Sequence, residues 1–174
     1  RGVSTSADLY VDGVRDDAQV FRDLYNLERV EVLKGTAGMM FGRGGGGGVI
    51  NRVTKQPIFG PVREASLSVG SWDQVRGTVD VGNALDESAA WRLNAMAEHA
   101  GSFRDGVDLD RWAINPTVGL ALGARSLLTL GFEHLRDDRT ADRGIPAQNG
   151  RPYETDPGTF FGNANYSLRF LSGL

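Results

Sequence analysis

The stretch Trp91–Glu98, Trp-Arg-Leu-Asn-Ala-Met-Ala-Glu, alternates apolar and polar side chains along most of its length. Successive side chains of a β-strand point to opposite faces, so a period of two residues predicts a strand with one apolar and one polar face. The same alternation recurs in Glu64–Val69, Val75–Val81, Trp112–Leu122, Leu128–Glu133 and Asn163–Phe170. Turn residues separate these segments, and the sequence therefore predicts an antiparallel sheet of six strands.

Residues 1–61 have a different composition, with short strand-like segments separated by Gly-rich stretches. Strands are predicted at Leu9–Val11, which ends at the turn signal Asp12-Gly13, and at Glu28–Lys34 and Gly48–Thr54. Short helices are predicted at Ala18–Asn26, capped by Asp17, and at Thr36–Phe41. The sequence thus indicates a small α+β domain over residues 1–61 and a β-rich domain over 62–174.

The β-rich part fits two architectures. In an outer-membrane barrel, short turns lie at one end and longer loops at the other, and the connections here are of both kinds. The short ones are Gly70–Gln74, Asn83–Ala89 and Gly123–Arg125, and the long one is Arg136–Thr159. Trp91 and Trp112 would suit an interfacial girdle. The alternative is a soluble antiparallel sheet whose apolar face packs on a core.

Pro116 lies in the middle of one predicted strand. Proline has no backbone N–H and therefore removes one hydrogen bond from a β-ladder. In either architecture we expect a bulge or a sheet edge at this residue.

Composition excludes several classes of protein. Gly supplies 24 of 174 residues, about twice its usual share of roughly 7%, but without the period of collagen. No apolar run reaches the ~18 residues of a membrane-spanning helix. The net charge of −3, without a basic block, disfavours nucleic-acid binding. The chain has no Cys, which excludes disulfides and thiolate chemistry.

Motifs of catalysis are absent or out of context. Gly42–Gly47 satisfies G-x-G-x-x-G, but it precedes a predicted strand, whereas a dinucleotide site needs a helix there. We interpret the run as a tight turn with positive φ. His99 and His134 have no ligand-spaced neighbours, and the chain contains no G-x-S-x-G nucleophile motif. We therefore expect neither an enzyme nor a resident metal or cofactor.

Four ordered segments resemble the plug domain of the TonB-dependent outer-membrane receptors. They are Leu9–Arg15 (LYVDGVR), Leu27–Gly35 (LERVEVLKG), Phe41–Gly44 (FGRG) and Gly47–Lys55 (GGVINRVTK). The remaining sequence, including Thr140–Pro146 and Gly150–Pro152, is similar to the ferric catecholate-type siderophore receptors of that family. The resemblance covers nearly the whole chain.

The resemblance implies a plug inside a transmembrane barrel of ~22 strands. The six predicted strands are too few for such a barrel, so we expect a fragment: the C-terminal part of a plug and the first strands of an incomplete barrel. The resemblance also implies that the receptor imports ferric siderophore across the outer membrane of a Gram-negative bacterium. The implied partners are the siderophore, outer-membrane lipid and a TonB complex, which binds a segment missing from this chain.

The resemblance also implies site residues. The family's plug faces the barrel wall through charge pairs at positions matched by Arg29, Glu31 and Arg43. The Gly-rich turn of the plug corresponds to Gly42, Gly44, Gly47 and Gly48. Ferric catecholates are anionic and aromatic, so guanidinium groups and rings in loops suit them. The predicted ligand contacts are Arg15, Gln19, Phe21, Tyr25, Arg139, Arg143, Arg151 and Tyr153.

Two alternatives to ferric siderophore transport stay open at this point. A receptor of the same family for cobalamin, haem or a citrate-type siderophore would share this plug. A soluble β-rich binding domain would need residues 64–170 to fold alone, without detergent.

Overall fold

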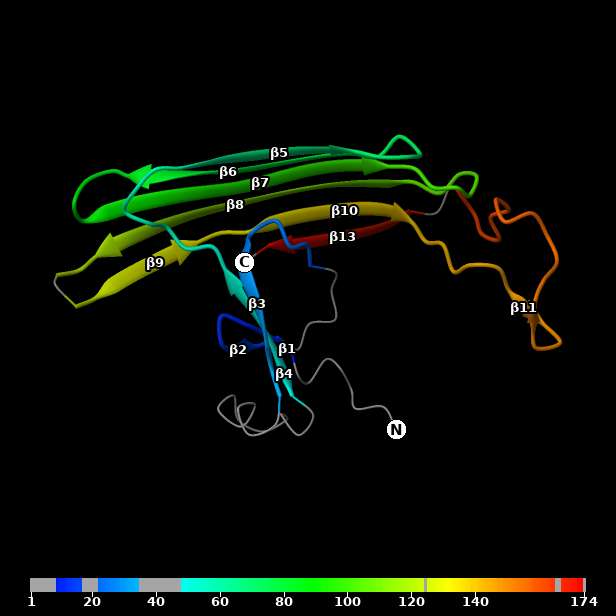
Figure 1. The fold of residues 1–174 in the computed structure, drawn as a ribbon, viewed down its shortest axis with the longest axis horizontal. Helices are drawn as coiled ribbons and strands as arrows, with labels where there is room; N and C mark the ends of the chain where they lie inside the picture. The colour runs from blue at the N-terminus through cyan, green and yellow to red at the C-terminus, as the bar shows by residue number, and fades with distance from the viewer. Residues whose placement is uncertain (1–8, 17–21, 35–47, 124, 165–166, 174) are drawn as a thin grey trace. The chain divides into compact units, whose positions relative to one another are not determined.

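The computed structural model describes residues 9–16, 22–34, 48–123, 125–164 and 167–173. The chain divides into two compact units, Arg1–Gln56 and Pro57–Leu174, whereas the sequence places the division at Pro61. Each unit contains its own sheet, with the strands labelled in Figure 1. Within the described residues, no helix is long and apolar enough to cross a membrane.

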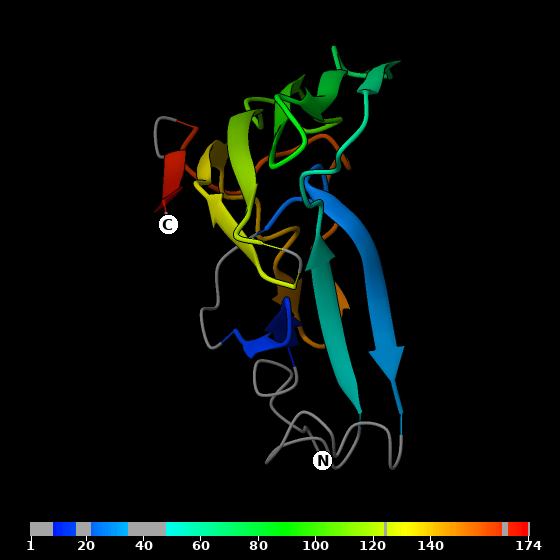
Figure 2. The same cartoon turned by 90° about the vertical axis from the view of Figure 1, so that its left-hand side faces the viewer.

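The first unit is built on a four-stranded sheet in the order β2-β1-β4-β3. Its strands are β1 (Leu9–Val11), β2 (Val14–Arg15), β3 (Leu27–Leu33) and β4 (Val49–Thr54). β4 pairs parallel with β1 and antiparallel with β3, which lies beside it in Figure 2. The three strands predicted for this region are confirmed.

The turn between β1 and β2 is the predicted Asp12-Gly13 turn. Both residues have positive φ, 50° and 80°, which short polar residues and glycine adopt most readily. The Asp12 carboxylate also accepts hydrogen bonds from the backbone N and Oγ1 of Thr54, at 2.8 and 2.6 Å. Asp12 therefore ties the β1–β2 hairpin to the end of β4.

The predicted helix Ala18–Asn26 is wrong for its described part, Arg22–Asn26, which is turn and irregular chain. The Asp23 carboxylate accepts hydrogen bonds from the backbone N–H groups of Leu24 and Tyr25, at 2.7 and 3.0 Å. Such local bonding by Asp competes with helix formation and favours a turn. The rest of this helix, like the helical turn predicted at Thr36–Phe41, lies outside the described residues.

The second unit contains a seven-stranded antiparallel sheet in the order β13-β10-β8-β7-β6-β5, with β9 paired to β8 beside β10. Its strands are β5 (Val62–Val69), β6 (Val75–Ala84), β7 (Ala89–Ala100), β8 (Leu109–Ala121), β9 (Leu127–Gly131), β10 (His134–Thr140) and β13 (Ser167–Gly173). The six predicted strands are present, and β10 is a seventh that the alternation did not reveal. Its sequence, His-Leu-Arg-Asp-Asp-Arg-Thr, is too polar to show a period of two.

The two faces of this sheet are inverted relative to a soluble sheet that packs on an apolar core. The pairing places Asp80, Asn94 and Asn115 in one cross-strand row, and they are only 4%, 0% and 7% exposed. The opposite face carries Val79, Trp112 and Leu130, which are 43%, 43% and 58% exposed. Apolar side chains thus cover the accessible face, whereas the buried face carries charged and amide side chains together with Ala90, Met96, Ala113 and Leu135.

The connections of the sheet lie at two ends (Figure 1). The turns after β6 and β8 are at one end, and the connections after β5, β7 and β10 are at the other, which we call the loop end. The short turn Gly70–Gln74 therefore lies with the long loops, because consecutive antiparallel hairpins alternate between the two ends. The predicted separation of short turns from long loops is wrong for this one connection.

Pro116 produces neither a bulge nor a sheet edge, but the facing strand is interrupted at Phe132 and Glu133, between β9 and β10. It lies in the interior strand β8, and the register is the same on both sides of it, with Thr117 opposite Gly131 and Ile114 opposite His134. Phe132 N donates to Pro116 O at 3.0 Å, and Asn115 Nδ2 donates to Phe132 O at 2.9 Å. The Asn115 amide therefore replaces the N–H that proline lacks.

We expect Asn115→Ala to lower the free energy of unfolding by about 1–3 kcal/mol, because the Phe132 carbonyl loses its donor. Adding Pro116→Ala supplies a backbone N–H at the same place and should recover part of this loss. Thermal unfolding of the single and double variants of the full-length protein in detergent measures both effects. An Asn115→Ala loss that Pro116→Ala leaves unchanged would contradict the replacement.

Candidate functional site

A second short hairpin lies within the long connection after β10. It consists of β11 (Ala147–Gln148) and β12 (Arg151–Pro152), joined by Asn149 and Gly150. The two turn residues have φ of 52° and 74°, as expected for an Asn-Gly hairpin turn. A turn whose residues already prefer its geometry presents its flanking side chains at little entropic cost.

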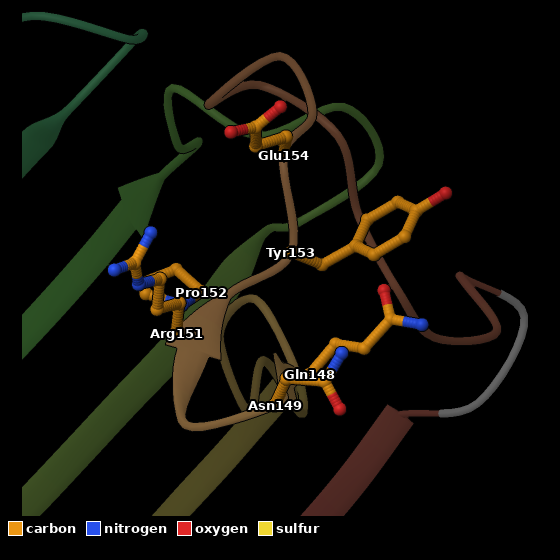
Figure 3. Close-up of a pocket in the computed structure, with 6 residues that line it drawn as sticks. All are labelled: Gln148, Asn149, Arg151, Pro152, Tyr153 and Glu154. Carbon is orange, nitrogen blue, oxygen red and sulfur yellow. The ribbon is translucent and has the colours of Figure 1, made fainter.

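The hairpin forms a hollow of about 660 Å³, lined by Gln148, Asn149, Arg151, Pro152, Tyr153 and Glu154. In Figure 3, Gln148 and Tyr153 extend to one side of the hairpin and Arg151 to the other. Arg151 supplies a cation, the two amides supply donors and acceptors, and Tyr153 supplies an aromatic ring. These groups suit a planar aromatic ligand with an anionic group at Arg151, and the carboxylate of Glu154 leaves the lining as a whole without net charge.

Tyr153 is held in place by contacts of both its backbone and its ring. Its backbone N–H donates to Pro146 O at 2.9 Å, and its ring meets the edge of the Phe161 ring with centroids 6.0 Å apart. Both rings stay accessible, at 47% and 44% exposure. A ligand ring would therefore find two oriented aromatic surfaces here.

The predicted arginines of this connection differ in their partners. Arg139, at the end of β10, forms a salt bridge with the buried Asp137. Arg143 and Arg151 are exposed and have no charged or hydrogen-bonding partner among the described residues. Arg151 and Tyr153 thus both line the hollow, from opposite sides of the hairpin, and Arg139 does not line it.

The structure describes two of the four ligand contacts predicted in the first unit. Arg15 is exposed at the end of β2, whereas Tyr25 is buried, at 7% exposure. Gln19 and Phe21 lie outside the described residues. These four stay predictions.

The charges predicted to join plug and barrel are satisfied inside the first unit. Arg29 Nε donates to Glu31 Oε1 at 2.8 Å, and Asn51 Nδ2 donates to Glu31 Oε2 at 2.9 Å across the β3–β4 pair. The hydrogen bond from Asn51, followed by that from Arg29, lowers the pKa of Glu31 below its ordinary value of 4.5. Arg43 lies outside the described residues, so the role of these charges stays a prediction.

We expect the stability of the first unit to fall in acid partly through Glu31. Its lowered pKa contributes stability that is fully present above about pH 4.5 and is lost as the pH falls through the folded-state pKa. Between pH 6 and pH 3, the melting temperature of the Glu31→Gln variant should therefore fall less than that of the unsubstituted protein. Glu28→Gln, the same charge change on the same strand, is the control, and equal pH profiles for the two variants would refute the role of Glu31.

The Gly-rich turn is described only at Gly48, since Gly42, Gly44 and Gly47 lie outside the described residues. Gly48 has φ of 129°, and a Cβ there would approach Leu33 O to 2.8 Å. Gly48 itself therefore needs the conformational freedom of glycine, whereas the turn predicted for Gly42–Gly47 stays a prediction.

A cluster of charges crosses the buried face of the second unit. Glu98 on β7 accepts hydrogen bonds from Arg76 on β6 at 2.6 Å and from Arg111 on β8 at 2.5 Å. On the same face, Arg92 donates two hydrogen bonds to the carboxylate of Asp80, each 2.8 Å long. Neighbouring strands are thus joined by side chains as well as by their backbones.

Sequence reasoning missed three residues that line the hollow, Gln148, Asn149 and Glu154, and also Phe161, which contacts Tyr153. The Asn149-Gly150 dipeptide is a hairpin signal and could have located the turn. Nothing in the local sequence indicates the contact of Phe161 with Tyr153. Among the described residues, no group of three or more His, Asp or Glu side chains could hold a metal ion.

Comparison with known proteins gives a consistent result. Residues 1–49 match the family model described as TonB-dependent Receptor Plug Domain. The chain is 41% identical over 147 residues to the catecholate siderophore receptor Fiu of Escherichia coli K12, covering 84% of this chain and 19% of Fiu. It is 35% identical over 142 residues to the metal-pseudopaline receptor CntO of Pseudomonas aeruginosa, covering 80% of this chain and 20% of CntO.

The fold agrees with these sequence matches. The crystal structure of Fiu in its open form superposes with a TM-score of 0.74 at 40% identity, covering 81% of this chain and 22% of that one. The chain spans about a fifth of the length of the curated relatives that it matches.

Proposed function

The chain belongs to the TonB-dependent receptors, and we propose that it forms part of one that imports ferric siderophores across the outer membrane of a Gram-negative bacterium. In this proposal the first unit is plug and the second is barrel wall. Its homologues are transport receptors rather than enzymes. Iron is cargo, and no resident cofactor is proposed.

The inverted sheet of the second unit carries this proposal. An apolar face that is exposed and a polar face that is buried are the arrangement of a barrel wall between lipid and a polar interior. The exposed face includes the large side chains Leu67, Val118 and Leu128, which are 74%, 36% and 40% exposed. A soluble sheet of this composition would expose an apolar patch prone to aggregation. The inversion therefore argues against the soluble alternative.

We further propose that this sheet is the first part of a larger barrel. Among the described strands, β5 pairs only with β6 and β13 only with β10, so each has one free edge. Free edges of this length favour pairing with further strands. Barrels of ~22 strands are known for outer-membrane transporters. The partners we propose for the complete receptor are outer-membrane lipid and a TonB complex, and nucleic acid is not among them.

The ligand we favour is a ferric catecholate. It is anionic and aromatic, and the lining of the β11–β12 hollow includes the unpaired cation of Arg151 and the ring of Tyr153, which contacts the ring of Phe161. The similarity to Fiu supports the same class. The similarity to CntO makes a receptor for another metal complex the second candidate.

Uptake of radioactive iron tests the proposal. The full-length receptor is expressed in a Gram-negative strain that lacks its own catecholate receptors, with and without functional TonB. We expect accumulation of iron supplied as a catecholate complex only when both receptor and TonB are present. Accumulation only from a different metal complex would favour the second candidate, and no TonB-dependent accumulation would overturn the proposal.

A further inference from the structure

The turn between β5 and β6 holds a tryptophan in an unfavourable backbone conformation. Trp72 and Asp73, its central residues, have φ of 56° and 58°. The chain uses the same geometry in two other hairpins, where the central pairs are Asp12-Gly13 and Asn149-Gly150. Those pairs adopt positive φ readily, whereas a bulky residue such as tryptophan is rarely found there. Strain of this kind persists where the side chain is needed for another purpose.

The indole of Trp72 is oriented by the loop after β7. Its ring meets the Phe103 ring edge-on, with centroids 6.2 Å apart and an angle of 63°. Gly101 N donates to Trp72 O at 2.8 Å, and a Cβ on Gly101 would lie 2.9 Å from the same oxygen. A glycine is therefore needed for the close approach that holds Trp72 beside Phe103.

Phe103 is fixed in turn by Arg104. The guanidinium carbon lies 5.1 Å from the centroid of the Phe103 ring, in the range of a cation–π contact. Arg104 Nη1 donates to both carboxylate oxygens of Asp142 in the long connection, at 2.6 and 2.7 Å. Three connections at the loop end are thereby tied together around the two rings.

Despite these contacts the rings stay accessible, with Trp72 58% and Phe103 51% exposed. Two oriented aromatic rings, one of them kept in place against backbone strain, form a surface on which a flat ring can stack. Internal packing does not require this exposure. The pair therefore reads as a contact surface for something outside the described residues.

We propose that Trp72 and Phe103 form an aromatic platform that receives the catechol rings of a ferric catecholate, with Arg104 as a positioning residue beneath Phe103. This inference rests on the proposed function, because it assumes a ligand with planar aromatic rings. It adds a contact surface that is separate in sequence from the β11–β12 hollow. The platform recognises the rings, and the cation of Arg151 recognises the charge.

The test is equilibrium binding of an iron(III) tris-catecholate to the purified full-length receptor in detergent. Trp72→Asn removes the ring but suits the positive φ, so the melting temperature should hold or rise. We expect its affinity for the complex to fall about three- to ten-fold, the size of one aromatic contact. Trp72→Phe and Phe103→Tyr should retain most of the affinity. Trp112→Phe, which alters an indole on the apolar face, should leave it unchanged.

An iron(III) trihydroxamate complex, which has no aromatic ring, separates ring recognition from general damage. The affinity of the Trp72→Asn variant for this complex should differ less than two-fold from that of the wild type, whether the wild type binds it weakly or strongly. Catecholate affinity that is unchanged in Trp72→Asn, with a wild type that binds and imports, overturns the platform and leaves the proposed function standing. A wild type that fails to bind the catecholate complex overturns both.

Discussion

Replacing Glu98 with alanine is expected to lower the free energy of unfolding of the full-length protein by about 3 kcal/mol. Glu98 is 9% exposed and accepts the hydrogen bonds of Arg76 and Arg111 from the two neighbouring strands. The substitution leaves both guanidinium groups without this shared counter-ion on a buried face. Removing the shared partner of two charged groups on a buried face is among the larger costs that one substitution can impose. Thermal or urea unfolding in detergent measures the loss.

Two controls distinguish this effect from a general loss of charge. Glu87→Ala alters an exposed glutamate in the turn after β6 and should change stability by less than about 0.5 kcal/mol. Replacing Glu98, Arg76 and Arg111 together with leucine or methionine removes the charges and should recover much of the stability. A loss in Glu98→Ala no larger than in Glu87→Ala would show that the cluster contributes nothing to stability.

Replacing Arg151 with alanine should weaken binding of an iron(III) tris-catecholate by at least ten-fold. Hydrogen bonds to a charged group contribute about 1.5–3 kcal/mol, and every 1.4 kcal/mol corresponds to a ten-fold change in affinity. Arg151 is exposed and unpaired among the described residues, so its charge is available to a ligand in the hollow. Equilibrium binding to the full-length receptor, repeated at two salt concentrations, measures the effect.

Two control variants test whether the shape of the charged group at Arg151 and its position in the hollow matter for binding. Arg151→Lys keeps the charge but loses the planar fork, and should retain part of the affinity. Arg63→Ala removes an exposed arginine from β5, away from the hollow, and should leave affinity unchanged. Equal affinities for wild type and Arg151→Ala would exclude the hollow as a binding site for the anionic complex. The melting temperature should not change, since Arg151 has no described partner to lose.

Much of the fold follows from the local sequence. The alternation in Val75–Val81 and Trp91–Glu98 predicts both the strands and which side chains share a face, because strand geometry alone sets a period of two. Asp12-Gly13 likewise predicts its turn from backbone preference. Local patterns fail where the chain is polar, as in β10, and where Asp23 favours a turn over a helix.

The candidate sites depend on contacts between residues far apart in the sequence. Arg151 and Tyr153 were predicted from their chemistry, but their hollow depends on the hairpin turn at Asn149. Trp72 meets Phe103 only because β6 and β7 pair in the register that brings Gly101 beside the first turn. No local pattern shows that a tryptophan will have positive φ.

By itself, then, the sequence determined the two-part organisation, the strands with one polar and one apolar face, and the receptor family, since each of these is written in local periodicity or ordered motifs. The tertiary structure alone decided the strand order and the register. These bring Glu98 between Arg76 and Arg111 and place the Asn115 amide where Pro116 lacks an N–H. The physical reason is that the face on which a side chain lies follows from the geometry of one strand, whereas the side chains that it contacts depend on how several strands pair.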